Sequence, residues 1–299
     1  MKIVLATDGS PGSTIAAAFV AANLVPDFAA PVEVVTVSEW PAHDDGWEVS
    51  ERVGASLPPE GSALHAATDV LRRHAFPTTA TVLAGRADAA IAGFARSVGA
   101  GLIVLGSRGL HGWRRAVAGS ISSSVAHASS VPVLVAGTPG RVSRVVVGYD
   151  GSESARAALE AAAGLPLAGP PEWVVCVAYE AAPPLASGIA PTMVAAIEDA
   201  YAADLAAAKR AAEVVAHEAV VMLAAHGITA PAAVGHGPAP DVLLDVASHA
   251  LPSLLVVGDR GQSHLRRLVL GSTSAALLGA GHVDVLIAHG PPPGPLPEH

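Results

Sequence analysis

Two fifteen-residue stretches of the chain share one spacing of glycine and serine. One reads GSRGLHGWRRAVAGS over residues 106–120, and the other reads GDRGQSHLRRLVLGS over residues 258–272. In both, glycines occupy the first, fourth and fourteenth positions and a serine follows. Glycine lets backbone amides approach an anion closely, and the amides of a helix N-terminus attract phosphate. Each stretch therefore predicts a phosphate-binding loop, although glycine after a strand and before a helix is also ordinary loop chemistry.

A second pair of polar residues ends the first apolar run of each half of the chain. Asp8 and Asp150 are both followed by Gly-Ser. A carboxylate repels a triphosphate, so we expect these side chains to accept hydrogen bonds from ribose hydroxyls or adenine N–H groups. The alternative is an Asx turn or helix cap, formed by Asp8 or Ser10 in the first half. The sequence leaves both interpretations open.

The remaining polar residues of the glycine stretches give no clear catalytic set. At most one residue of Arg114-Arg115, and one of Arg266-Arg267, can reach a ligand, because adjacent side chains point in different directions. His111 and His264 could act as general acid or base, or could be surface residues. The chain has no Walker lysine after a glycine loop and no Gly-x-Ser-x-Gly elbow. We therefore assign no catalytic residue and no metal ligand.

The chain is built from two similar halves. KIVLATDGS near the start matches RVVVGYDGS from residue 144, and three further apolar runs match in the same order. The turn-rich sequence GTPGRVS separates the halves, which we place at residues 1–138 (half one) and 143–290 (half two). The proline-rich residues 291–299 are predicted to be a disordered tail.

Short β-branched apolar runs alternate with alanine-rich segments in both halves. This alternation predicts an α/β fold of two tandem doubly wound domains, each a parallel sheet with helices on both faces. Residues 41–62 show no clean period and are predicted to be a loop. Cys176, the single cysteine, lies in the apolar run WVVCVAY and is predicted to be a small core residue.

The composition excludes two classes of partner. Seventeen basic against 26 acidic residues give a formal net charge of −9, which argues against a basic nucleic-acid surface. Although 51% of residues are hydrophobic, polar residues interrupt every long apolar run, so no membrane span is expected. A cytoplasmic location fits a chain with one cysteine.

With these motifs together, the chain resembles the universal stress protein family in its tandem two-domain, ATP-binding form. The resemblance rests on the glycine spacing, the Asp-Gly-Ser motifs and the last apolar run, VPVLV in half one. It implies a five-stranded parallel sheet with a Rossmann-like arrangement in each half, and ATP, with Mg²⁺, in two sites. The residues implied are, in site one, Asp8, Val37, Gly106, Gly109, Gly119, Ser120 and Ile121, and, in site two, Asp150, Val177, Gly258, Gly261, Gly271, Ser272 and Thr273.

The resemblance also implies how these residues are used. The backbone near Val37 and Val177 would contact adenine, and the last strands of the halves would pair, bringing residues 131–135 against 283–287. A homodimer is expected, and the protein partner is unknown. Half two departs from half one at Asp259, which replaces Ser107 and could weaken site two unless it points away or meets a metal. Asp284 replaces Pro132, and Glu153 replaces Pro11.

Three functions fit these observations. The first is an ATP-binding stress-response regulator that uses the nucleotide as a sensor or switch. The second is a slow ATPase or nucleotidyl-transfer enzyme, for which the histidines and arginines of the glycine stretches are the motivation. The third is an interaction scaffold that kept the loops without the ligand. The absence of a positioned base favours the first.

Overall fold

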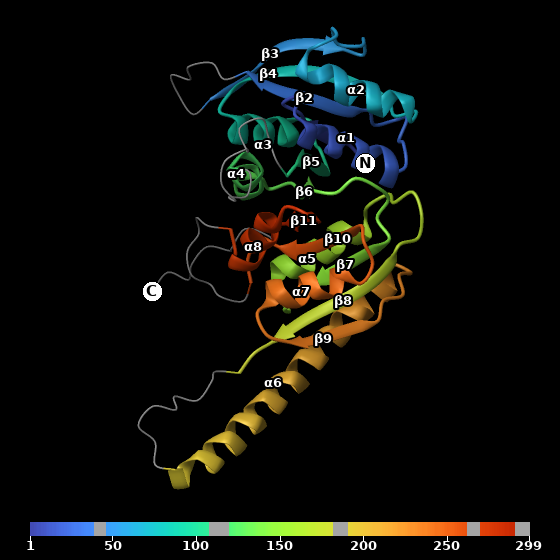
Figure 1. Cartoon of the computed structure of the whole chain (residues 1–299). Helices are drawn as coiled ribbons and strands as arrows, with labels where there is room; N and C mark the ends of the chain where they lie inside the picture. Colours follow the sequence, from blue (N-terminus) through green and yellow to red (C-terminus); the bar gives the residue numbers. More distant parts are fainter. Residues whose placement is uncertain (39–45, 108–119, 182–190, 262–269, 291–299) are drawn as a thin grey trace, which may run out of the picture.

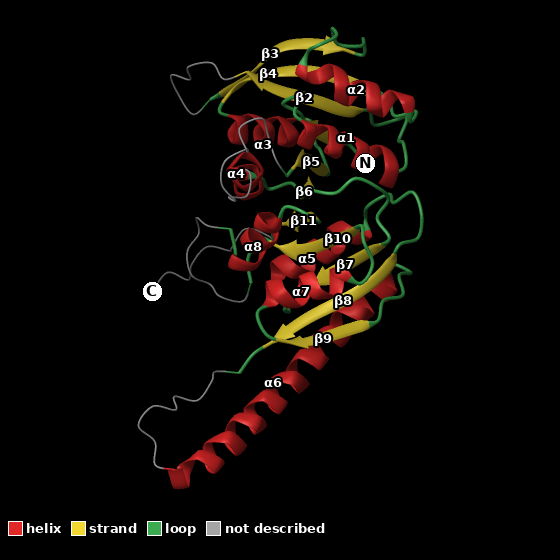
Figure 2. Ribbon diagram, in the orientation of Figure 1, coloured by secondary structure: helices red, strands yellow, loops and turns green. Residues whose placement is uncertain are grey.

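The computed structural model contains one continuous mixed sheet that runs through both halves of the chain. It describes residues 1–38, 46–107, 120–181, 191–261 and 270–290. The strand order in this part of the chain is β3-β4-β2-β1-β5-β6-β11-β10-β7-β8-β9 (Figures 1 and 2). Half one supplies the strands from β3 to β6, and half two supplies those from β11 to β9.

The elements of half one follow the predicted alternation, with one addition. They are β1 (Ile3–Ala6), α1 (Pro11–Asn23), β2 (Val32–Ser38), β3 (Trp47–Gly54), α2 (Ala63–Arg73), β4 (Thr78–Gly85), α3 (Ala87–Ser97), β5 (Leu102–Gly106), α4 (Ser120–Ala128) and β6 (Val133–Ala136). Half two contains β7 (Arg144–Gly148), α5 (Glu153–Ala163), β8 (Glu172–Tyr179), α6 (Pro191–Ala225), β9 (Ala232–His236), α7 (Ala239–Ser248), β10 (Ser253–Gly258), α8 (Ser272–Ala280) and β11 (Asp284–Ala288).

The central strands are apolar at nearly every position because helices cover both of their faces. Successive residues of β1 show this directly, since Leu5 packs into the core under α1, α2, α5 and α6, while Val4 packs into the core under α3, α4, α7 and α8. Both side chains are fully buried. The α/β class, with parallel strands and helices on both faces, is confirmed. No helix in the described part of the chain is long and apolar enough to cross a membrane.

The prediction that residues 41–62 form only a loop is wrong, because β3 lies within them. It pairs antiparallel with β4 at the edge of the sheet, so half one has six strands, whereas half two has the five parallel strands expected. Trp47 packs edge-on against Phe94 of α3, with ring centroids 6.2 Å apart. The sequence WEVSERV does alternate, but irregularities between Val49 and Glu51 and between Arg52 and Gly54 interrupt the pairing and hide the period of two.

The two halves are joined edge to edge by their last strands. β6 and β11 pair antiparallel, with Val135 opposite Val285, Leu134 opposite Leu286, and Val133 opposite Ile287. This confirms the predicted contact between residues 131–135 and 283–287. An antiparallel pair of equivalent strands places the halves about an approximate two-fold axis.

Candidate functional site

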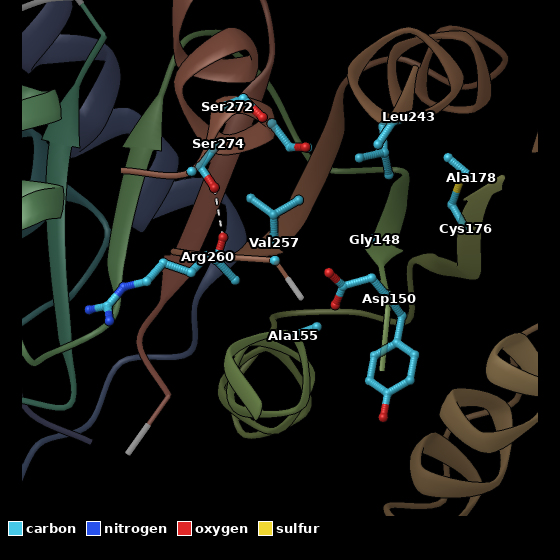
Figure 3. A pocket seen from close by; sticks show the side chains of 16 residues that line it. Gly148, Asp150, Ala155, Cys176, Ala178, Leu243, Val257, Arg260, Ser272 and Ser274 are labelled. Carbon is cyan, nitrogen blue, oxygen red and sulfur yellow. Dashed lines mark hydrogen bonds between the residues drawn. The ribbon is translucent and has the colours of Figure 1, made fainter. Parts of the chain in front are cut away.

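A pocket in half two lies at the carboxyl ends of β7, β8 and β10, beside the first turns of α7 and α8 (Figure 3). It encloses about 710 Å³ of empty space, part of it open to solvent. In open α/β sheets ligands bind at this edge, where the strand order reverses. Every described residue assigned to site two, except Val177, lines this pocket.

One end of the pocket is formed by backbone at the start of α8. Gly271 is the N-cap of this helix and provides no side-chain cap. Its amide donates to the carbonyl of Asp259 at 2.7 Å, so this amide is used within the chain. The next two residues, Ser272 and Thr273, also line the pocket, and amides in the first turn have no acceptor within the helix. Their position and the helix dipole suit an anion.

The carboxylate of Asp150 lines the same pocket (Figure 3). Its Oδ1 accepts a hydrogen bond from the Ser152 amide at 3.0 Å. A Cβ built on Gly261 would lie only 2.9 Å from its Oδ2, so a larger residue there would push the carboxylate aside. The Asx turn considered from the sequence is therefore present, and it holds the carboxylate at the pocket wall.

Half one repeats this arrangement at Asp8. Its Oδ1 accepts from the Ser10 amide at 2.9 Å, and Ser10 in turn caps α1 through the Ser13 amide at 3.2 Å. The cap of α5 is the matching Ser152, which accepts from the Ala155 amide at 3.1 Å. The helices that follow Asp8 and Asp150 are thus capped by their own serines, in contrast to α8.

The first glycine of each stretch has a packing role that spacing alone does not reveal. A Cβ on Gly258 would lie 2.6 Å from the carbonyl carbon of Ser154 and 2.7 Å from the amide of Ala155. A Cβ on Gly106 would overlap the backbone of Gly12 in α1. Both glycines therefore let the first turn of a helix pack against the end of a strand. Gly258 also lines the pocket, where its carbonyl accepts from the Ser274 hydroxyl at 2.6 Å.

The opposite end of the pocket is apolar. The sequence comparison that pairs Val37 with Val177 is out of register by one residue here. The backbone amide of Thr7 donates to the carbonyl of Val35, and the equivalent amide of Tyr149 donates to the carbonyl of Cys176. Val35 therefore corresponds to Cys176, and two residues later Val37 corresponds to Ala178 and not to Val177. Side chains alternate along a strand, and a slip of one residue reverses the face. Accordingly Ala178 and Cys176 line the pocket, while the side chain of Val177 packs into the core on the other face.

Two further apolar residues of this end come from α7, which the sequence motifs did not include. Leu243 and Ala239 line the pocket from the first turns of that helix. A Cβ on Gly148 would lie 3.0 Å from the Leu243 side chain, so glycine at this position avoids crowding Leu243. Cys176 is buried, as expected, and burial raises the pKa of its thiol to about 12, with a smaller contribution from the charge of Asp245.

Asp259 does not line the pocket. Its side chain is only 7% exposed and pairs with Arg260, with Arg260 Nε 2.9 Å from Asp259 Oδ2. The guanidinium of Arg260 extends away from Asp150 in Figure 3. The substitution of aspartate for Ser107 thus places a charge beside the site without directing it into the pocket.

The structure describes site one in part. Asp8, Gly106 and the start of α4 at Ser120 lie at the same edge of the sheet, beyond β1 and β5. Val37 is partly buried against the core on the α3 and α4 side of the sheet, and Ile121 is 42% exposed. Gly109, Gly119, His111 and the pair Arg114-Arg115 lie outside the described residues, as do His264 and Arg266-Arg267 of half two.

The comparisons with known proteins agree on one family. The model of the universal stress protein family matches residues 1–137 and 141–289. No curated protein matches the chain. The crystal structure of a universal stress protein from Archaeoglobus fulgidus DSM 4304 is 18% identical, over 96% of this chain and 98% of that one, with a TM-score of 0.56.

Two other solved structures belong to the same group. A putative universal stress protein from Pseudomonas aeruginosa UCBPP-PA14 is 15% identical, over 97% of this chain and 93% of that one, with a TM-score of 0.55. A universal stress protein crystallised in complex with cAMP is 29% identical, over 50% of this chain and 97% of that one, with a TM-score of 0.33. The two structures that match nearly the whole chain, at 18% and 15% identity, show that it shares their fold.

Proposed function

This chain belongs to the universal stress protein family, and from that premise we propose that it is an ATP-binding regulator of a stress response. Each half would hold one ATP at the carboxyl ends of its strands, and the nucleotide would act as a signal and not as a substrate. Binding would order the loops around the nucleotide and so change the surface offered to a partner.

One observation carries the proposal. The bare N-terminus of α8, the carboxylate of Asp150 and the apolar group around Ala178 line a single pocket (Figure 3). These three chemistries suit a nucleotide, with phosphates on the amides of Ser272 and Thr273, ribose hydroxyls donating to Asp150, and a base against Cys176, Ala178 and Leu243.

Mg²⁺ would be held by the phosphates of the nucleotide. In the described ranges there is no group of three His, Cys, Asp or Glu side chains that could hold a metal ion. A chain that provides backbone amides and one carboxylate suits an incoming Mg–ATP complex, in which the cation arrives with the phosphates.

Two titratable side chains that line the pocket, Cys176 and Tyr149, favour binding over turnover. Burial raises the pKa of Cys176 to about 12, so its thiol stays neutral at neutral pH. The hydroxyl of Tyr149 is directed to Glu218 on the other side of the sheet, and its pKa is raised to about 12 by burial and by Glu218. Neither group can act as a base toward a phosphate there at neutral pH.

Calorimetric titration with Mg–ATP tests the proposal. We expect two ATP per chain for the wild type, and one after Gly261→Glu, because the new carboxylate enters the space beside Asp150. Gly279→Glu in α8 is the matched control, since a Cβ at Gly279 meets nothing within 4 Å, and it should retain both sites. Gly109→Glu combined with Gly261→Glu should abolish binding.

Two simple measurements separate the alternatives. Mass spectrometry of the denatured purified protein shows whether an adenine nucleotide co-purifies, and a wild type that neither carries nor binds nucleotide would leave only the scaffold function. Prolonged incubation of the complex with ATP, followed by chromatography of the nucleotides, measures turnover. Formation of many ADP or AMP molecules per protein chain would identify an enzyme instead.

A further inference from the structure

Helix α6 is much longer than its place on the sheet requires. It has 35 residues, whereas its counterpart α2 in half one has 11. Its buried side chains begin at Ala212 and continue through Ala216, Ala219 and Leu223. Residues 191–211, which we call the arm, extend past the edge strand β9 into solvent (Figure 1). In the described part of the chain, α6 packs mainly against β8, β9 and α5.

The arm has an apolar stripe that continues the face by which α6 packs on the sheet. With 3.6 residues per turn, one side of the arm contains Val194, Ile197, Tyr201, Leu205 and Ala208. From Ile197 the steps are four, four and three residues, and the same steps lead from Ala208 to the buried Ala212, Ala216 and Ala219. An eleven-residue period keeps a stripe on one side of a nearly straight helix. The face that is buried on the sheet therefore reaches solvent on the arm, where Val194 is 43% exposed.

We propose that the arm pairs antiparallel with the arm of a second copy of this chain. The stripe is symmetric about Tyr201, because the steps from Val194 to Ala208 are three, four, four and three. A two-fold axis at Tyr201 places Ile197 opposite the partner's Leu205, and Val194 opposite the partner's Ala208. A homodimer with such an axis uses the same surface of both copies.

The length of the arm fits the same axis. Residue 201 is also the midpoint of residues 191–211. The first residue of the partner's helix would therefore lie opposite residue 211, just before α6 packs onto the sheet from Ala212. The two arms would overlap over about 30 Å, at 1.5 Å per residue, without entering the space that β8 and β9 occupy. A partner helix centred closer to the body would meet the sheet.

One strand edge that could join two copies is already used, because the last strands β6 and β11 pair within the chain. The outer edges of the sheet are β3 and β9. The arm presents its apolar stripe without covering a core of its own.

Sedimentation velocity of the full chain over a wide concentration range tests the proposal. We expect a dimer for the wild type and a dissociation constant raised at least about a hundredfold by Tyr201→Glu, which would bury two charges at the axis. Val214→Glu is the matched control on the outer side of the same helix, where Val214 is 72% exposed, and it should leave the dimer intact. Circular dichroism should show the same helix content and unfolding midpoint for all three proteins.

Cross-linking tests which face of the arm pairs. Tyr201→Cys should form a disulfide between copies on mild oxidation, and Val214→Cys should not. A wild type that is monomeric at every concentration, or a dimer insensitive to Tyr201→Glu, would overturn the proposal, as would cross-linking at Val214 in place of Tyr201. ATP binding is measured separately and is expected to be unchanged in these variants.

Discussion

Asp284 of half two accepts a hydrogen bond from the backbone amide of Gly137 in half one, with 2.8 Å between nitrogen and Oδ1. The same carboxylate accepts from the amide of Thr138 at 3.0 Å and from its hydroxyl at 2.8 Å. Asp284 is fully buried, and its position in half one is occupied by Pro132. One aspartate therefore holds the link between the halves at the point where β6 and β11 meet.

Removal of this carboxylate should loosen the junction. We expect Asp284→Ala to lower the free energy of unfolding by about 2–4 kcal/mol, because two amides and a hydroxyl lose a buried acceptor. Urea unfolding at neutral pH measures the change. Thr138→Ala removes one donor and should cost about 1 kcal/mol, so equal effects from the two variants would contradict the role of the carboxylate.

The same residue predicts a pH dependence. Burial raises the pKa of Asp284 above its usual 3.8, and the hydrogen bonds from Thr138 and Gly137 oppose this in part. The folded protein therefore holds the proton more tightly than the unfolded chain, and this contribution is lost as the pH rises through the folded pKa. The difference in unfolding free energy between wild type and Asp284→Asn should shift against the wild type over that window. A shift in the opposite direction would show that the pKa is lowered.

The single thiol should be slow to react. Since burial raises the pKa of Cys176 from 9.0 to about 12, its thiolate fraction at neutral pH is roughly a thousandfold lower than that of an exposed cysteine. Alkylation with iodoacetamide, followed by mass spectrometry, should be slow in the folded protein and fast in urea. The chain has one cysteine, so the signal belongs to this site. Rapid labelling of the folded protein would contradict both its burial and the raised pKa.

The first glycine of the second stretch should tolerate no side chain. Gly258→Ala places a Cβ 2.6 Å from the backbone of Ser154, and we expect a loss of about 2–4 kcal/mol in stability. Gly279→Ala is the comparison, because a Cβ there has open space and a helical glycine gains about 0.5–1 kcal/mol on replacement by alanine. Thermal unfolding of both variants decides whether Gly258 is a packing residue, since a ligand-binding role alone would leave the stability of the free protein unchanged.

Tyr149 should stabilise the contact between α6 and the sheet. Its hydroxyl donates to Glu218 Oε1 at 2.9 Å, and Tyr149→Phe should cost about 1 kcal/mol at neutral pH. Burial, followed by Glu218, raises the tyrosine pKa from 10.0 to about 12, so the wild type should lose stability relative to Tyr149→Phe as the pH rises from 10 to 12. Unfolding measured across alkaline pH checks this, and a constant difference would be inconsistent with the raised pKa.

The sequence by itself determined the α/β class, the two halves and the edge of the sheet where the candidate pocket lies. Those features depend on local patterns, since a buried parallel strand must be apolar throughout, and glycine lets a loop approach an anion closely. The positions of Asp150, Gly261 and Ser272 at one pocket follow from such patterns. The pairing of β6 with β11 followed from the resemblance to a known family.

Tertiary structure alone decided the features that depend on contacts between distant segments. β3 is a strand because β4 offers an open edge, and its irregular pairing hides the alternation in the sequence. Whether Val177 or Ala178 faces the pocket depends on the register of β8 against β7, which a one-residue shift reverses. Leu243 reaches the pocket because α7 folds over Gly148. Each of these depends on which surface meets which, and a linear pattern contains no information about that until the chain is packed.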